Sequence, residues 1–167
     1  MQRIIILLSV FLFVYLPYCF SQETSTSDGD QQHRQASHLE QEAIELISKD
    51  RMDEGLSKMR AALALEPTGS RHLNYGSILF GNGTAIFKSG DLKQGKAVLK
   101  EAEGELRSAI DLFDPSQNAT QISQCYFLLG EIYAHALKDS VRAKEFYEQS
   151  LSYYDNGQSK EALELYQ

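Results

Sequence analysis

The chain has 167 residues and a mass of 18.8 kDa, the size of one domain, so a barrel enzyme joined to a second domain is excluded. Its formal net charge is −7 and its pI about 5.1, and so acidic a chain offers no electrostatic surface for nucleic acid or for an anionic membrane. Hydrophobic residues make up 43% and charged residues 23%, which is the balance of a globular protein.

Residues 1–21 have the layout of a secretory signal peptide. Arg3 precedes an apolar run, and the small residues Cys19 and Ser21 stand at the −3 and −1 positions of a cut after Ser21. We therefore expect an exported protein, in a periplasm, a secretory-pathway lumen or the extracellular space, with no membrane contact after cleavage. The alternative is an uncleaved membrane anchor over residues 4–20, a length at the lower limit for a span.

Cleavage would leave Cys125 as the one cysteine of the mature chain, which excludes an intrachain disulfide. Loss of Arg3 makes the net charge one unit more negative. Residues 22–35, QETSTSDGDQQHRQ, contain no large apolar side chain, and this composition predicts a flexible linker. The folded domain is expected over residues 36–167.

From residue 36 onward, apolar side chains recur at helical spacing, and no run alternates as a strand would. The predicted helices lie, in chain order, near residues 39–47, 56–63, 71–88, 92–113, 120–137 and 141–153, with a short last helix from about 159. Asp91 precedes Gln94 by three residues, a helix N-cap pattern, and Ser70 and Ser159 are two further N-cap candidates. The expected fold class is all-α, with the helices in antiparallel pairs.

Three of the predicted helix pairs share a spacing of small and large residues. In the clearest pair, Gly130 follows Leu129, Tyr133 comes three residues later, and Ala143 and Tyr147 lie on the second helix. This pattern resembles the tetratricopeptide repeat. The small places are held by Ala43 and Gly55 in the first pair and by Gly83 and Gly95 in the middle pair. The resemblance implies a short right-handed α-solenoid of about three degenerate repeats, with the last helix as a C-terminal cap.

The period departs from the 34 residues of that family. Ala43, Gly83 and Gly130 are separated by 40 and 47 residues. A long helix over residues 92–113 explains part of the excess, and the turn of the third pair is one residue longer than the family's. Periods of about 40–47 residues also fit other helical arrays such as HEAT repeats. The Leu-Gly-x-x-Tyr string favours the tetratricopeptide interpretation.

In tetratricopeptide arrays the first helix of each pair lines an inner groove. The resemblance implies the following groove positions: Glu40, Ile44, Ile47, Phe80, Thr84, Phe87, Lys88, Phe127, Glu131 and His135. The set is largely apolar, so it implies a protein or peptide ligand with hydrophobic anchors. Core packing is the alternative for Ile44, Ile47 and Phe87.

No catalytic or cofactor pattern is present: the chain lacks a phosphate loop, an HExxH motif and a GxGxxG motif after a strand. Its four histidines are scattered without metal-ligand spacing, and the lone Cys125 is expected to be a buried packing residue. We expect no enzymatic activity, no cofactor and no metal. Asn118 begins an Asn-Ala-Thr sequon, a candidate glycosylation site only in a eukaryotic secretory pathway.

These patterns predict a non-catalytic protein-interaction module, an adaptor or scaffold, in an extracytoplasmic compartment. Two alternatives stay open. One is a structural or assembly subunit of a larger envelope or secretory complex that uses its convex face. The other is the substrate-recognition part of a luminal enzyme.

Overall fold

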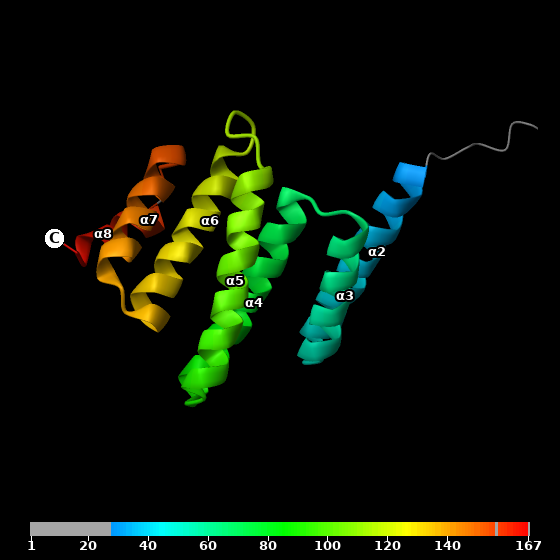
Figure 1. Ribbon diagram of the computed structural model, residues 1–167, viewed down its shortest axis with the longest axis horizontal. Coiled ribbons are helices and arrows are strands. Elements are labelled where there is room, and N and C mark those ends of the chain that lie inside the picture. The colour runs from blue at the N-terminus through cyan, green and yellow to red at the C-terminus, as the bar shows by residue number, and fades with distance from the viewer. Residues whose placement is uncertain (1–27, 156, 167) are drawn as a thin grey trace, which may run out of the picture. The chain divides into compact units, whose positions relative to one another are not determined.

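The computed structural model describes residues 28–155 and 157–166 (Figure 1). The chain divides into a unit of residues 1–34 and a unit of residues 35–167. Of the first unit only residues 28–34 are described; they are helical and exposed. The predicted signal peptide lies outside the described residues. The paragraphs below concern the second unit.

The described part of the chain is all-helical and contains no strand, which confirms the predicted all-α class. The elements are α2 (Asp28–Ser48), α3 (Met52–Leu65), α4 (Gly69–Ser89), α5 (Leu92–Leu112), α6 (Ala119–Glu131), the π-helix η1 (Ile132–Leu137), α7 (Ser140–Tyr153) and α8 (Gly157–Glu164). Successive helices from α3 onward pack against one another in chain order (Figure 1). The close match of α4, α5 and α7 to the predicted ranges reflects their regular apolar spacing.

Helix α2 begins earlier than the sequence suggested. We expected a linker up to residue 35, whereas residues 28–35 are already helical. Asp28 and Asp30 lie in the first turn, where carboxylates interact favourably with the positive end of the helix dipole. The first buried side chain is nevertheless Ala36, the residue at which we placed the start of the folded domain.

The observed helix N-caps agree with the predicted ones at one site and differ from them at two. Asp91 caps α5, since its side chain accepts a hydrogen bond from the Gln94 amide at 3.0 Å. The N-cap of α4 is Thr68 and not Ser70, which lies inside the helix. Ser159 is likewise inside α8 and fully buried, with its hydroxyl donating to Ser150 Oγ at 2.9 Å. At α4 the preceding threonine makes the local cap bond, since Thr68 Oγ1 accepts from the Arg71 amide at 3.3 Å, whereas Ser159 is held by its tertiary contact with Ser150.

Close helix packing explains the small residues of the repeated pattern. A Cβ added at Gly83 of α4 would lie 2.8 Å from Leu99 Cγ of α5, and one added at Gly95 of α5 would lie 2.7 Å from the Phe87 amide nitrogen. No side chain fits at such distances, so both positions need glycine. Gly90 has a φ of 105°, a left-handed conformation that glycine adopts without strain, and it allows α4 and α5 to reverse direction within two residues.

Two buried tyrosines tie neighbouring helices together through their hydroxyls. Tyr75 of α4 accepts from Arg60 Nε of α3 at 2.7 Å and donates to Glu101 of α5 at 2.8 Å. Tyr133 of η1 donates to Glu103 of α5 at 2.8 Å. These bonds allow large aromatic rings to be buried without an unsatisfied hydroxyl.

The predicted fifth helix changes type before its end. An α-helix was expected through residue 137, but α6 passes into the π-helix η1 after Glu131. Lys138, with a φ of 55°, ends the element, and the Asp139 amide donates to Tyr133 O at 2.9 Å. A π-turn takes up one residue more than an α-turn. Ala143 and Tyr147 of α7, which follow this turn, are both buried.

Among the residues described, no helix is both long enough and apolar enough to cross a bilayer.

Candidate functional site

A pocket of about 370 Å³ opens where α4, α5, α6 and η1 meet. Its volume lies in the range of about 300–1,000 Å³ that is usual for ligand sites. The lining residues are Phe80, Thr84, Phe87 and Lys88 of α4, Leu99 of α5, Glu131 of α6, and Ile132, His135 and Ala136 of η1. Most of them are apolar, with a cation, an anion and a histidine among them.

One face of α4 forms the first wall. Phe80, Thr84, Phe87 and Lys88 are spaced by four, three and one residues, which places them along one stripe of an α-helix. The glycine at position 83 lies between them and lets α5 approach closely. Leu99 of α5 is consequently almost fully buried and contributes the floor of the pocket.

The second wall comes from the end of α6 and from η1. Glu131 and Ile132 are followed four residues later by His135 and Ala136, and all four line the pocket. Ile132 and Ala136 are buried, whereas His135 is exposed. The π-turn thus presents two adjacent pairs of side chains to the same space, one pair apolar and one pair polar.

Glu131 is held in place by a buried hydroxyl. The Tyr147 hydroxyl of α7 donates to Glu131 Oε1 at 2.7 Å, and His135 Nε2 lies 3.6 Å from Oε2. Burial, and then the bond to this carboxylate, raise the pKa of Tyr147 far above its usual value. The tyrosine therefore stays protonated and keeps donating across the physiological pH range.

Lys88 lies in the last turn of α4 and is exposed. Within residues 28–155 and 157–166 it has no ion-pair or hydrogen-bond partner. The negative end of the helix dipole favours a cation at this place. This attraction leaves the ammonium N–H groups of Lys88 able to donate hydrogen bonds. The rim of the pocket thus carries one unpaired cation on α4 and one fixed carboxylate on α6.

Six of the ten residues expected in a groove lie around this one pocket: Phe80, Thr84, Phe87, Lys88, Glu131 and His135. Phe127, one helical turn before Glu131, instead packs on Tyr147 with ring centroids 6.0 Å apart. On α2, Ile44 is 54% exposed and does not line the pocket. Ile47 packs beside Gly55 of α3 and is half-buried, but it is not part of the core cluster of the described residues, whereas Phe87 both packs against that cluster and lines the pocket.

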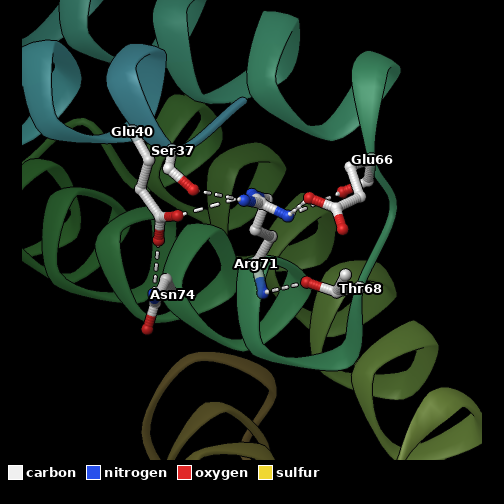
Figure 2. A network of polar contacts seen from close by, with 6 residues as sticks. All are labelled: Ser37, Glu40, Glu66, Thr68, Arg71 and Asn74. Carbon is white, nitrogen blue, oxygen red and sulfur yellow. Dashed lines mark hydrogen bonds and ion pairs between the residues drawn. The ribbon is translucent and has the colours of Figure 1, made fainter. Parts of the chain in front are cut away.

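Glu40 also lies away from the pocket, in a polar network around Arg71 of α4 (Figure 2). Arg71 is only 5% exposed; its Nη1 donates to Glu66 Oε2 at 2.5 Å and its Nη2 to Ser37 Oγ at 3.0 Å. Its Nε lies 3.4 Å from Glu40 Oε2, and Asn74 Nδ2 donates to Glu40 Oε1 at 2.6 Å. We call these five residues the arginine clamp. It binds α2 and the start of the α3–α4 connection to α4.

Three lining residues were missed by the sequence analysis: Leu99, Ile132 and Ala136. Leu99 follows Gly95 by four residues on the same helix, and this spacing was the signal that the sequence offered; the structure places Leu99 beside Gly83. Ile132 and Ala136 had no such signal, because a straight α-helix places their side chains differently from a π-turn.

Other candidate groups have ordinary structural places. Cys125 is fully buried, and burial raises the pKa of its thiol to about 12. Asn118 precedes α6, and its side-chain oxygen accepts from the Asp114 amide at 3.2 Å. Within the described ranges, no three histidine, cysteine, aspartate or glutamate side chains gather as a metal site would need.

No protein-family model matches the chain, and no curated protein matches it either. The tetratricopeptide resemblance stays a prediction, based on the spacing of small and large residues.

Proposed function

We propose that this chain is a non-catalytic protein-interaction module built as a short tetratricopeptide-like solenoid. The support is a pair of helix contacts that recur at equivalent positions of the pattern. Gly83 meets Leu99 in the middle hairpin as Gly130 meets Tyr147 in the third. In the same way, Gly55 contacts Ile47 in the first hairpin and Gly95 contacts Phe87 in the middle one, and each partner precedes its glycine by eight residues.

The proposed ligand is a peptide segment that inserts an apolar side chain between α4 and η1. The observation that carries this proposal is the pocket itself. Six of the ten residues that the sequence predicts for the groove line this pocket. Phe80, Phe87, Leu99 and Ile132 supply apolar surface for such an anchor, and the burial of one large side chain contributes about 1.5–3 kcal/mol.

A peptide-display selection on the purified protein tests the function. Peptides that bind should contain a large apolar residue, and Phe80→Ala should weaken them at least about tenfold, as truncation of an anchor contact does. Because Phe80 also packs against the core, Thr84→Arg is a second variant that fills the pocket from a half-buried position. Phe146→Ala is the matched control, since that ring lies on Tyr126 and Tyr133 and not in the pocket.

Selected peptides that bind Thr84→Arg as tightly as the native protein, with unchanged circular dichroism, would contradict the pocket as the binding site. Such a result would favour the assembly-subunit alternative, in which another face makes the contacts.

We also propose that the module works outside the cytoplasm, on the basis of the leader pattern in residues 1–21. N-terminal sequencing of the protein from its native source should read Gln22 as the first residue. A chain that retains Arg3 would favour the anchor over residues 4–20.

A further inference from the structure

The pocket has charges of opposite sign on its two walls. Lys88 contributes a cation from α4, and Glu131 contributes a carboxylate from α6. We propose that the bound segment carries an apolar anchor flanked by an acidic residue on the α4 side and a basic residue on the α6 side. This inference rests on the proposed peptide-binding function and names the chemistry of the ligand.

Lys88 supports the acidic flank. Its ammonium group is exposed, borders the pocket, and meets no carboxylate in the described part of the chain. Two arginines, one on α5 and one on α7, already have partners: Arg107 pairs with Glu103 at 3.0 Å and Arg142 with Asp139 at 3.5 Å. A ligand carboxylate beside Lys88 would therefore gain an ion pair without displacing an existing one.

Glu131 supports the basic flank. Its side chain is 24% exposed and is oriented by the Tyr147 hydroxyl, so its position is set before a ligand arrives. A carboxylate accepts about four hydrogen bonds, and these contacts occupy only part of that capacity. An amine or guanidinium at the pocket rim can bind the remaining lone pairs.

The apolar floor makes the two charges selective. Phe80, Phe87 and Leu99 give the space between the walls an apolar lining, and charges interact more strongly where the effective dielectric constant is low. A segment with like charges on both sides of its anchor would place one of them against a wall of the same sign. The repulsion between like charges weakens the binding of such a segment. Charge complementarity therefore contributes more to specificity than to affinity.

Three capped pentapeptides test the inference: Gly-Asp-Phe-Lys-Gly, Gly-Asp-Phe-Asp-Gly and Gly-Lys-Phe-Lys-Gly. Their dissociation constants are measured by nuclear magnetic resonance titration at low salt. The mixed-charge peptide should bind about three- to tenfold more tightly than either like-charged one, the range of one or two solvent-accessible ion pairs. High salt should reduce the difference.

Reversal of the charge on the α4 wall gives the most decisive test of the charge assignment. Lys88→Glu makes both walls acidic, so the order should change and the dilysine peptide should bind best. Lys88 is exposed, so this variant should fold normally. Lys49→Glu, with the same change of charge on α2 and away from the pocket, should leave the order unchanged.

Equal binding of all three peptides, or an unchanged order in Lys88→Glu, would overturn the charge assignment and leave the apolar pocket intact as a site. A version of each peptide with alanine in place of phenylalanine separates this from failure of the function itself. If those versions bind as well as the phenylalanine peptides, or if no peptide binds, the proposed function fails together with the charge assignment.

Discussion

At the scale of single residues, the ring of Tyr147 occupies the space beside Gly130 where a side chain would otherwise be. Tyr147 is fully buried, and its hydroxyl donates to Glu131 at the pocket. The absence of a side chain at Gly130 therefore allows the tyrosine both to pack against α6 and to orient Glu131. Gly81 of α4 has no such role, because nothing lies within 4 Å of a Cβ added there.

Gly130→Ala should therefore destabilise the protein by about 1–3 kcal/mol, the usual cost of overpacking a well-filled core. Gly81→Ala is the matched control and should stabilise by about 0.5–1 kcal/mol, because alanine favours a helix interior. Urea denaturation of both variants measures the difference. Equal free energies of unfolding in the two variants would be inconsistent with the close contact of α6 and α7.

Cys125 gives a second prediction at this scale. With a pKa raised to about 12 by burial, only on the order of 10⁻⁴ of the thiol is ionised at pH 8 in the folded protein. Iodoacetamide should leave the native thiol unmodified over hours and should alkylate it within minutes in 8 M urea. Rapid modification under native conditions would show that this side chain is accessible.

At the scale of elements, the arginine clamp decides how α2 is held. Arg71 reaches Glu40 and Ser37 on α2 and Glu66 after α3, while its own helix is α4. Removal of the guanidinium leaves partly buried carboxylates without their counter-charge, which is the costly way to break such a group. Sequence periodicity gave no sign of this clamp, because its hydrogen-bonded pairs lie up to 34 residues apart.

Arg71→Met should lower the free energy of unfolding by about 3 kcal/mol, the lower end for a broken buried ion pair because Glu66 is a third exposed. Amide hydrogen exchange should accelerate in α2 and α3 more than in α6 and α7. Arg51→Met is the control: its pair with Glu54 is exposed on both sides and should contribute less than about 1 kcal/mol. Similar losses in both variants would contradict a special role for the clamp.

At the scale of the whole molecule, stability should fall at alkaline pH through two buried tyrosines. Burial, and then hydrogen bonds to Glu101 and Glu131, raise the pKa values of Tyr75 and Tyr147 well above 10. A folded-state pKa above the unfolded one contributes stability below about pH 10, and this contribution is lost as the pH rises toward the folded value. Each such tyrosine costs at most about 1.4 kcal/mol per pH unit above 10.

Urea midpoints at pH 8 and pH 11 measure this loss. The decrease should be smaller in Tyr147→Phe than in the native protein, because phenylalanine has no hydroxyl to ionise. Tyr154→Phe, at a half-exposed position, should show the native decrease. An identical decrease in all three proteins would mean that other groups govern alkaline unfolding.

Much of the fold was predictable because the apolar spacing of α4, α5 and α7 is regular and because the Asp91 cap of α5 is a local pattern. The candidate site was predictable in part. The α4 wall follows from a helical stripe, and Glu131 and His135 follow from the pattern of the third hairpin. The positions of Ile132 and Ala136 at the pocket depend on the π-helix η1, and Glu40 forms an ion pair with Arg71 away from the pocket. These two placements result from tertiary packing, and local sequence patterns do not predict them.

The sequence by itself determined the helical class, the order and length of most helices, and the small residues that let them approach. These properties depend on neighbours within about four positions along the chain, where spacing and capping act. Only the tertiary structure decided that α4, α5 and η1 leave a pocket between them and that Glu40 belongs to a clamp. Those facts depend on side chains far apart in the sequence, such as Phe80 and Ala136 in the pocket and Glu40 and Arg71 in the clamp, whose contacts exist only once the helices have packed.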